Sequence, residues 1–387
     1  MDIKGLLTRR VAEVIDHNHL ERALHSGKKL RVKLGIDPTG RELHIGHAVP
    51  LLKLREFQDA GHTAVFIIGD WTAMIGDPSG KSETRKSLTF EETRRNAKTY
   101  FDQAFKILKK KQTEIHYNSE WFKKFDFHQT IQLLANASVS QLMAHETFRE
   151  RLKKGQPFFA HELLYPMLQG YDSVAVRADV ELGANDQKFN LLMGRQVQKA
   201  FGQASQDMVI LQYLTGLDGR MMGKTLHNYI ALNDSAGEMF GKVMSLTDDL
   251  VGHYFELCTE VSEKEIARIK KEHPKAQKVR LAKEIVTIYH GAIAASGAED
   301  EFNRKFGKGS NGDEGINAEF ELKKKPGSYS IVDLLAEGRL AASKSEARRK
   351  LAEGAVQVDG TKVKEETKVK VKNNTLIRLG KRFLRVK

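Results

Sequence analysis

RVKLGIDPTGRELHIGH, residues 31–47, is the stretch from which the fold can be predicted. Its first six residues alternate polar and apolar side chains, which is typical of a strand. After the polar loop, His44 begins a segment whose apolar residues keep helical spacing until Gly61, and TAVFIIG at 63–69 predicts a second, buried strand. A strand, a helix and a strand joined by short links form a βαβ unit, which requires parallel strands with helices on the faces of the sheet.

The same alternation of helices and strands extends through the first part of the chain. We expect an amphipathic helix in the first 24 residues and mostly helical structure over 90–165. The later patterns predict a strand at 173–183, a helix at 187–200 and a strand at 207–213. The expected fold class is therefore α/β, with a Rossmann-type parallel-sheet nucleotide-binding domain over residues 1–232.

Three further regions follow this domain. Residues 233–302 have helical periodicity with charged faces, and the Gly-rich polar stretch 303–327 is typical of a linker. Residues 328–387 combine two short amphipathic helices with basic strands, and Asp359-Gly360 predicts a hairpin turn. We therefore expect an α-helical domain and then a small α+β domain.

Composition excludes several classes of protein. Hydrophobic residues make up 40% of the 387, which is usual for globular proteins, and no run of apolar residues is long enough for a membrane span. The N-terminus lacks the apolar run and cleavage site of a signal peptide. The single cysteine, Cys258, excludes an intramolecular disulfide and a multi-cysteine metal site. We therefore expect a cytoplasmic protein that does not enter membranes.

The positive charge is concentrated at the end of the chain. The formal net charge is +13, and residues 321–387 contain 18 Lys and Arg against 8 Asp and Glu. A basic block on a folded scaffold favours a polyanionic partner, most often a nucleic acid. A surface that only keeps the protein in solution is the alternative interpretation.

His44-Ile45-Gly46-His47 is the first candidate for chemistry, because it lies where a predicted parallel strand leads into a helix. The start of a helix offers unpaired N–H groups and a positive dipole, which suit a phosphate. Histidines three residues apart share one helix face, so both rings can donate to one polyphosphate. Gly46 would let an adenine or ribose pack closely. A chance tetrapeptide is the alternative.

Two loops carry cations that could reach a phosphate. Lys81 and Arg85 lie in the loop Asp77-Pro-Ser-Gly-Lys-Ser-Glu-Thr-Arg, and Lys224 and Thr225 follow Met222-Gly223. Cationic side chains on flexible loops can move onto a leaving pyrophosphate. Each loop alone is equally consistent with an ordinary solvated surface.

Together, these three elements resemble the HIGH and KMSKS motifs and the intervening loop of the class I aminoacyl-tRNA synthetases. The pattern Tyr165-x-x-x-Gln169-x-x-Asp172 resembles the amino-acid pocket of the tyrosyl-tRNA synthetase family. Further matches to that family are Gly35, Asp37, Pro38 and Asn185-Asp186-Gln187. The C-terminal segment is similar to the ribosomal S-four-type RNA-binding domain of bacterial tyrosyl enzymes, so the resemblance covers nearly the whole chain.

The resemblance implies a tyrosine–tRNA ligase that joins L-tyrosine to the α-phosphate of ATP, releases pyrophosphate and transfers the tyrosine to the 3′ end of tRNA(Tyr). The carboxylate nucleophile needs no base, because an α-carboxyl group with a pKa of about 3.5 is ionised near pH 7. We expect His44, His47 and Thr225 to bind the β- and γ-phosphates, and Lys81, Arg85 and Lys224 to stabilise the pyrophosphate. The implied ATP-binding residues are Gly35, Asp37, His44, Gly46, His47, Asp186, Gln187 and Lys224.

The resemblance also implies how the other substrates bind. Asp172 would accept a hydrogen bond from the phenol, with Asp77, Tyr165 and Gln169 around the α-ammonium group. Mg²⁺ would arrive with ATP and be held by phosphate oxygens and water rather than by a dedicated protein site. The candidate tRNA contacts are Arg348, Arg349 and Lys350, and the implied assembly is a homodimer with its interface in residues 120–165.

Two positions depart from the family pattern. Met221 replaces the first lysine of the KMSKS-like motif, so one cation is missing unless Arg220 substitutes for it. Lys33 stands where some tyrosyl enzymes have a tyrosine that contacts the phenol, which leaves the second phenol contact open.

Three alternatives remain from the sequence. A tryptophanyl-tRNA synthetase shares the fold and the ATP motifs, but Asp172 and the C-terminal segment argue against it. An RNA-binding protein that has lost catalysis would not need His44, His47 and Lys224 together. A nucleotidyltransferase acting on a small molecule would not need the basic C-terminal block.

Overall fold

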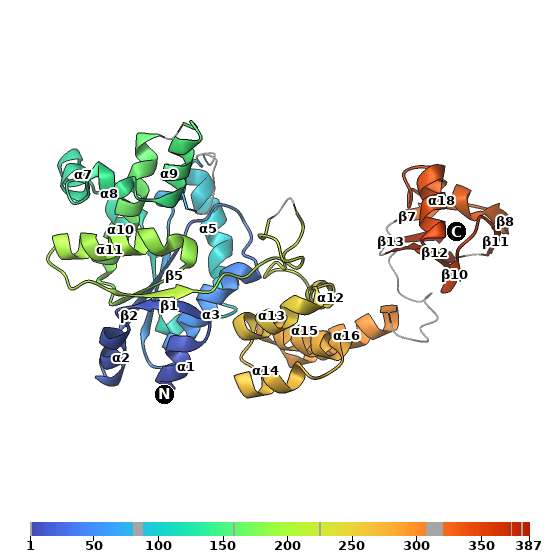
Figure 1. Cartoon of the computed structure of the whole chain (residues 1–387), viewed down its shortest axis with the longest axis horizontal. Helices are drawn as coiled ribbons and strands as arrows, with labels where there is room; N and C mark the ends of the chain where they lie inside the picture. Colours follow the sequence, from blue (N-terminus) through green and yellow to red (C-terminus); the bar gives the residue numbers. More distant parts are fainter. Residues whose placement is uncertain are drawn as a thin grey trace. The chain divides into compact units, whose positions relative to one another are not determined.

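The computed structural model describes residues 2–79, 88–157, 159–223, 226–306, 320–372, 374–380 and 382–387. The chain divides into two units, Met1–Ala295 and Ser296–Lys387. Figure 1 shows the mixed helices and strands of the first unit and the smaller, strand-rich second unit. In the described part of the chain, no helix is both long and apolar enough to cross a membrane.

A six-stranded sheet forms the centre of the first unit. Its strands, in the order in which they lie side by side, are β1 (Val11–Ile15), β6 (Asp207–Leu211), β5 (Val180–Ala184), β2 (Arg31–Ile36), β3 (Thr63–Ile68) and β4 (Thr113–Tyr117). Every neighbouring pair is parallel except β1 and β6. Almost all residues of β3 and β6 are buried, as expected for strands covered by helices on both faces. The predicted α/β fold with a parallel sheet is confirmed.

Helices cover both faces of this sheet. The helix α3 (Ile45–Asp59) packs on β2, β3 and β5, while α10 (Tyr165–Val176) and α11 (Lys188–Ala200) pack together on the opposite face. Figure 1 shows α10 and α11 above the strands, and α1 and α2 below them. The remaining helices before the last strand are α1 (Ile3–Thr8), α2 (His17–His25), α4 (Thr72–Ile75), α5 (Phe90–Ala104), α6 (Ser119–Phe122), α7 (Phe127–Leu134), α8 (Val139–Leu142) and α9 (Glu146–Lys153).

Two sequence predictions in this unit were wrong. The first 24 residues form α1, β1 and α2 rather than one amphipathic helix, because β1 pairs with the distant β6 from Val11↔Leu211 to Ile15↔Met208. The strand predicted at 173–183 begins only at Val180, since α10 continues to Val176 and ends at Arg177 in the left-handed conformation. A helix that is buried on most sides lacks the amphipathic pattern that would distinguish it from a buried strand.

The helices expected after the sheet are present. They are α12 (Ala236–Met244), α13 (Val251–Cys258), α14 (Glu263–Ile269), α15 (Pro274–His290) and α16 (Ala292–Phe306). Within the first unit, α12 and α13 pack against α15, and α13 also contacts α3. The helix that begins at His44 therefore touches both the sheet and this helical region.

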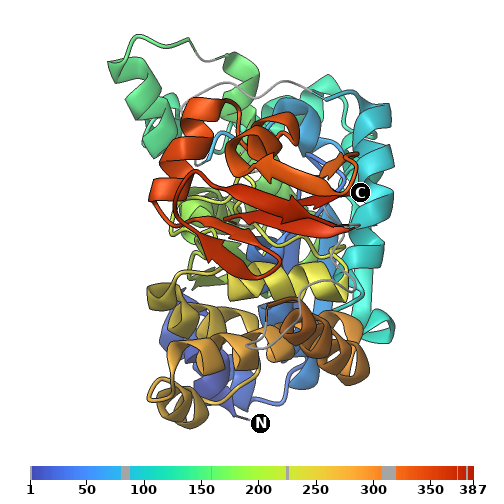
Figure 2. The same cartoon turned by 90° about the vertical axis from the view of Figure 1, so that its right-hand side faces the viewer.

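In its described residues, the second unit contains the larger part of α16, two further helices and two small sheets (Figure 2, orange to red). Its other elements are β7 (Phe320–Leu322), β8 (Gly327–Ser330), α17 (Ile331–Glu337), α18 (Lys344–Ala352), β9 (Val356–Val358), β10 (Thr361–Val363), β11 (Lys368–Val371), β12 (Thr375–Leu379) and β13 (Arg382–Val386). The five-stranded sheet has the order β10-β9-β12-β13-β7, and β11 pairs with β8.

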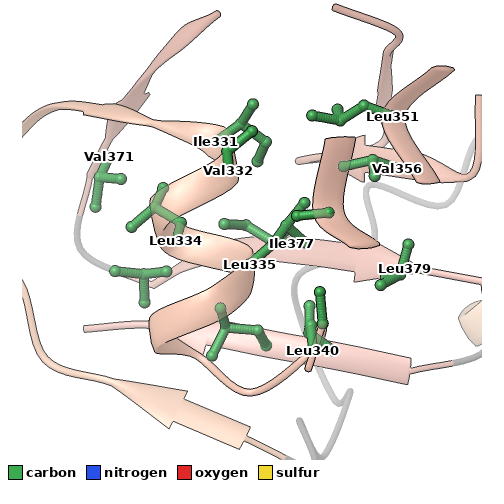
Figure 3. Packing of buried hydrophobic residues seen from close by; sticks show 14 residues of the cluster. Ile331, Val332, Leu334, Leu335, Leu340, Leu351, Val356, Val371, Ile377 and Leu379 are labelled. Carbon is green, nitrogen blue, oxygen red and sulfur yellow. The ribbon is translucent and has the colours of Figure 1, made fainter. Parts of the chain in front are cut away.

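The core and the turn of this unit agree with the sequence pattern. Figure 3 shows Ile331 and Leu335 of α17 packed beside Ile377 of β12, and all three side chains are buried. Asp359 and Gly360, between β9 and β10, both have positive φ, of 46° and 78°. A two-residue hairpin turn needs this conformation at both positions, so the predicted turn is confirmed.

Candidate active site

The histidines at the start of α3 form a reciprocal cap. The Nδ1 atom of His44 accepts a hydrogen bond from the Gly46 N–H at 3.2 Å, and Nδ1 of His47 accepts one from the His44 N–H at 3.2 Å. The two ring centroids lie 3.8 Å apart. Because each Nδ1 is an acceptor, each neutral ring carries its proton on Nε2 and can offer that N–H as a donor. The cap therefore orients two imidazole donors at the positive end of a helix.

The chain after β6 lies against this cap. The Ile45 N–H donates to the carbonyl of Ile230 at 2.9 Å, and the Leu232 N–H donates to the carbonyl of Leu43 at 2.9 Å. A Cβ added to Gly46 would lie 3.0 Å from the His44 ring and 3.1 Å from Sδ of Met222, so glycine permits this close approach. The first and third sequence motifs are thus neighbours. Lys224 and Thr225 themselves lie outside the described residues.

Asn228 organises the loop that contains Met221 and Met222. Its side chain is nearly buried, donates to Oδ1 of Asp218 at 2.8 Å and to the Met221 carbonyl at 3.1 Å, and accepts from the Gly223 N–H at 3.0 Å. Asn228 could not be identified from the sequence, because it is a single amide residue beside an apolar segment and belongs to no motif.

Asp218 also holds the cation that was considered as a substitute for the missing lysine. Nε of Arg220 donates to Oδ2 of Asp218 at 2.7 Å. The hydrogen bond from Asn228, and then the contact with Arg220, lower the pKa of Asp218 to about 2. Arg220 is therefore engaged by a carboxylate that stays ionised near neutral pH.

Asp77 connects the second loop to the end of β5. Its Oδ2 accepts from Nε2 of Gln187 at 2.7 Å, and its Oδ1 accepts from the Ser79 N–H at 2.9 Å. Asn190, at the start of α11, donates to both Gln187 and Ser79, at 3.1 and 3.2 Å. Asp77 and Gln187, for which the sequence predicts different ligands, are therefore hydrogen-bonded to each other.

The remainder of this loop is described only in part. His145 approaches the Ser79 hydroxyl with Nε2 at 3.3 Å, and burial lowers the pKa of this histidine. Asp186 is exposed on the short turn Asn185–Gln187 that follows β5. Lys81 and Arg85 lie outside the described residues.

The contacts that join the end of β2 and the following loop to α10 leave a gap at Gly35. At one end of it, Oδ2 of Asp37 accepts from the Tyr165 hydroxyl at 2.9 Å, and Oδ1 accepts from Thr72 at 2.8 Å. At the other end, Nζ of Lys33 donates to the Gln169 carbonyl at 3.0 Å. Gly35 lies between the two contacts, is exposed, and would have no atom within 4 Å of an added Cβ. The missing side chain leaves space for a ligand under α10.

Asp172 is the buried acceptor of this region, with 4% of its surface exposed. Nε1 of Trp121 donates to Oδ1 at 2.9 Å, and Nδ2 of Asn118 approaches Oδ2 at 3.4 Å. Burial raises the pKa of Asp172 to about 7, against the opposing effects of Lys33 and the two hydrogen bonds. The sequence analysis missed Asn118 and Trp121, because they follow β4 and reach Asp172 only through the tertiary fold.

Gln169, one turn before Asp172 on the same helix, has an unused acceptor. Its Nε2 lies 3.4 Å from Oε1 of Glu181, while its Oε1 is buried and has no hydrogen-bond partner among the described residues. A buried amide oxygen without a donor is costly, so it favours a ligand that supplies one. An ammonium group would do so.

The candidate tRNA contacts belong to the second unit. Arg348, Arg349 and Lys350 lie on α18, and all three have carboxylate neighbours. Arg348 pairs with Glu366 at 2.9 Å and Lys350 with Glu353 at 2.6 Å. These ion pairs are solvent-exposed, and such pairs are weak enough for a phosphate to compete.

The site occupies the switch point of the sheet. The connection from β2 runs through α3 on one face, and the connection from β5 runs through α11 on the other, although β2 and β5 are neighbours. In open α/β sheets, ligands bind at the carboxyl ends of the two strands where the order reverses. Gly35, Asp37 and His44 follow or end β2, while Asp186 and Gln187 follow β5.

Comparisons of sequence identify the family. The model of tRNA synthetases class I (W and Y) matches residues 25–307, and the model of the Tyrosine–tRNA ligase SYY-like C-terminal domain matches residues 317–385. The Tyrosine–tRNA ligase 2 of Vibrio cholerae is 44% identical over 98% of this chain and 97% of its own length. The Tyrosine–tRNA ligase of Geobacter metallireducens is 45% identical over 93% of this chain and 91% of its own.

Solved structures share the fold at lower identity. A C-terminally truncated mitochondrial tyrosyl-tRNA synthetase of Aspergillus nidulans superposes with a TM-score of 0.67 at 21% identity, over 76% of this chain and 91% of that one. The tryptophanyl-tRNA synthetase of Plasmodium falciparum superposes with a TM-score of 0.59 at 13% identity, over 77% and 84%. The family models and the near full-length relatives show that this chain belongs to the class I tRNA synthetases, within the tyrosine–tRNA ligase family.

Proposed function

We propose that this chain activates L-tyrosine with ATP and transfers it to tRNA(Tyr). The observation that carries the choice of tyrosine is Asp172, a buried carboxylate with two neutral donors and remaining acceptor capacity, set among apolar neighbours. A phenol hydroxyl satisfies this acceptor, whereas phenylalanine would leave it unpaired. Tyrosyl-tRNA synthetases are themselves the standard example of this kind of selection.

The other end of tyrosine would lie toward the end of β2. The unused Oε1 of Gln169 accepts from the α-ammonium group, which also faces Tyr165 and Asp77. The gap at Gly35 gives the amino acid its space under α10. Phenol and ammonium are then recognised at opposite ends of one helix segment.

In the first step, a carboxylate oxygen of tyrosine forms a bond to the α-phosphorus of ATP, and the bond from that phosphorus to the bridging oxygen of pyrophosphate breaks. No protein base is needed, since the carboxyl group is already ionised. His44 and His47 donate to the phosphates at the start of α3, and Asp37, Asp186 and Gln187 lie at the strand ends where the nucleotide would bind. Lys81, Arg85, Lys224 and Thr225 are assigned to the pyrophosphate from their sequence positions.

ATP is the co-substrate, and Mg²⁺ would arrive with it. Within the described ranges, no three His, Cys, Asp or Glu side chains form a group that could hold a metal ion. We assign the ion to the phosphate oxygens and water, because Mg²⁺ usually keeps several water ligands and binds through substrate phosphates.

In the second step, a hydroxyl of the 3′-terminal adenosine of tRNA attacks the tyrosyl carbonyl carbon, an ester forms and AMP leaves. The second unit is suited to hold the tRNA backbone through phosphate contacts. Arg348, Arg349 and Lys350 are the proposed contacts. The proposed division of labour is catalysis by residues 1–232, anticodon-side contacts by the helices of 233–302 and RNA binding by 328–387. Of the stretch 303–327 that the sequence predicts as a linker, Phe320–Leu322 pairs with β13 in the sheet of the second unit.

A homodimer is the proposed assembly in a cytoplasmic setting. Four large apolar side chains on α7, α8 and α9 are exposed, namely Phe127 at 80%, Ile131 at 48%, Val139 at 67% and Leu152 at 61%. A second copy of the chain would cover them.

Light scattering should give about twice the 43.7 kDa subunit mass. Phe127→Glu should yield monomers, whereas the exposed control Ile293→Glu should not; a monomeric wild type would contradict the proposal.

Amino-acid-dependent exchange between ATP and pyrophosphate tests the activation step. We expect exchange with tyrosine, very little with phenylalanine or tryptophan, and none without an amino acid. Exchange with tryptophan that exceeds exchange with tyrosine would assign the chain to the tryptophan branch instead. Exchange that does not depend on any amino acid would contradict the proposed function.

A further inference from the structure

Lys33 is a fully buried lysine inside the sheet. Its side chain has no exposed surface, and Nζ contacts Oε1 of Glu181 at 2.8 Å, Oγ of Ser173 at 2.8 Å and the carbonyl of Gln169 at 3.0 Å. Burying an ammonium group costs free energy unless a close partner compensates its charge, and a functional role can explain why the group is kept. Neither ATP nor the tyrosine ammonium group is expected to need a cation at this depth.

The contacts of Lys33 lead to the phenol end of the proposed pocket. Lys33 lies on the same face of β2 as Gly35, because alternate residues of a strand share a face. Two of its partners, Gln169 and Ser173, belong to α10, and Ser173 directly follows Asp172. The charge of Lys33 acts on the Asp172 carboxylate and favours its ionised form.

Glu181 opposes this effect from the neighbouring strand. Its carboxylate is buried, accepts hydrogen bonds from Ser173 and Gln206, and pairs with Lys33. Its charge disfavours the ionised form of Asp172. One ammonium group therefore acts on two buried carboxylates, on Glu181 by direct contact and on Asp172 through its charge.

The other elements around Asp172 contribute neutral groups. Asn118 and Trp121 donate to it from the segment after β4, and Thr72 of α4 lies beyond Asn118 at 3.0 Å. The nearby apolar residues of α10 and α11 include Leu168, Met193 and Val197.

Charged groups further out are already engaged. Asp70 accepts from Ser119 and pairs with Arg94, and His116 pairs with Glu120 at the surface. Asp37 is held by Tyr165 and Thr72 at the other end of the gap.

We propose that Lys33 is a positioning residue for tyrosine selection, whose buried ammonium group favours the ionised form of Asp172 that accepts the phenol hydroxyl, with Glu181 opposing this effect. The inference rests on the proposed function, since it assumes that the phenol reaches Asp172. It also gives the buried Lys33–Glu181 pair a role that a purely structural ion pair would lack.

Removing either charge should have opposite consequences. Lys33→Met leaves Asp172 and Glu181 without a cation, so Asp172 holds its proton to higher pH. Glu181→Gln removes the negative charge that pairs with Lys33 and opposes the ionised form of Asp172, so Asp172 loses its proton at lower pH. If the Lys33–Glu181 pair only stabilised the fold, the two variants would not shift the titration of Asp172 in opposite directions.

The test measures equilibrium binding of L-tyrosine and L-phenylalanine to the full chain from about pH 5.5 to about pH 8.5. The ratio of the two dissociation constants cancels the titration of the ammonium end, because both ligands share it. In the wild type, the preference for tyrosine should fall as the pH decreases through about 7, where Asp172 takes up a proton. Lys33→Met should move this midpoint up, and Glu181→Gln should move it down, each by on the order of one pH unit.

Two further variants keep the test decisive. Lys33→Arg retains the charge and should keep the midpoint near that of the wild type, and the double variant Lys33→Met/Glu181→Gln should lie between the two single variants. If Lys33→Met does not fold, the midpoints of Glu181→Gln and Lys33→Arg still test the proposal. A midpoint that stays fixed in Glu181→Gln, or that moves up in it, overturns the proposal.

The proposed function and this inference fail in different ways. Wild-type protein that shows no preference for tyrosine over phenylalanine at any pH would contradict the proposed function. A wild type that prefers tyrosine, combined with variants that leave the midpoint unmoved, would contradict only the role of Lys33.

Discussion

At the scale of single residues, Asp172 shows a conflict between stability and selection. The fold buries this carboxylate, and burial raises its pKa to about 7. Folding therefore shifts Asp172 toward the neutral acid, while an ionised acceptor would serve the proposed phenol contact best. Trp121 and Asn118 reduce the conflict by donating to the carboxylate.

The conflict predicts a pH-dependent gain in stability for Asp172→Asn. The pKa is about 4 in an unfolded chain and about 7 in the folded one, so the protonated group stabilises the fold and this contribution is lost as the pH rises through about 7. The Tm of the variant minus that of the wild type should be larger at about pH 8.5 than at about pH 5.5. Thermal unfolding at both values checks it, and an unchanged difference would show that Asp172 titrates as it would in the unfolded chain.

Met221 marks the missing cation of the third motif. Its side chain is exposed, and Arg220 next to it is held by Asp218, so no replacement for the lysine is evident among these residues. Met221→Lys should raise the rate of tyrosine-dependent exchange several-fold by adding a charge near the departing pyrophosphate. Steady-state exchange measures this, with Met221→Gln as the uncharged control. An equal rate in both variants would mean that the charge is already supplied.

The sequence pattern could identify candidate site residues that lie on one helix. It could not identify the residues from other elements that contact them. Tyr165, Gln169 and Asp172 follow helical spacing, so one motif identifies all three. Asn118 and Trp121 reach Asp172 from more than 50 positions away in the chain, through the pairing of β3 with β4. No local pattern contains that contact.

At the scale of elements, the loop after β6 is held against the start of α3. The backbone hydrogen bonds of Ile45 and Leu232 fix the segment after the loop, and the Asn228 side chain ties Asp218, Met221 and Gly223 together. An ordered loop base is what a cation-bearing tip needs in order to meet the transition state in the right place.

Asn228→Ala should therefore lower catalysis more than binding. We expect kcat for exchange to fall on the order of 10-fold or more, while the KM for tyrosine changes little, because Asn228 does not line the gap at Gly35. Asn233→Ala, at an exposed asparagine nearby, is the control. A variant that raises the KM for tyrosine and leaves kcat unchanged would assign Asn228 to the amino-acid pocket instead.

Elements with strong local patterns were predictable, and elements defined by distant pairing were not. The strands β2 and β3 and the helix α3 have the bounds that their apolar spacing indicates. β1 becomes a strand only through its antiparallel pairing with β6. The end of α10, residues 173–176, has the sequence pattern of a strand because the helix is buried on most sides. In each case tertiary context overrides the local signal.

At the scale of the whole molecule, the proposed function assigns the chemistry to the first unit and RNA attachment to the second. The described residues that we propose for ATP and tyrosine lie at the switch point of the first unit, while residues 321–387 of the second unit contain 18 Lys and Arg against 8 Asp and Glu. The sequence could predict the candidate ATP and tyrosine residues from motifs, and the basic C-terminal block from composition. The ion pairs of α18 depend on the fold and could not be predicted from either.

Neutralising α18 should affect tRNA and leave activation intact. The combined change of Arg348, Arg349 and Lys350 to alanine should raise the KM for tRNA(Tyr) and leave tyrosine-dependent exchange unchanged. Its tRNA affinity should also depend less steeply on salt, with a slope smaller by about two to three, because fewer counterions are released. Filter binding at several salt concentrations checks this. An unchanged slope would move the contact to other lysines of the second unit.

The most direct test of the proposed function is a competition among amino acids for attachment to tRNA. The full chain is incubated with ATP, Mg²⁺, bulk tRNA and an equimolar mixture of the protein amino acids, and the aminoacyl-adenosine released by nuclease digestion is identified by mass spectrometry. We expect tyrosyl-adenosine alone, formed on tRNA(Tyr). Tryptophanyl-adenosine, a mixture of aminoacyl-adenosines, or exchange activity without any aminoacyl-adenosine would contradict it.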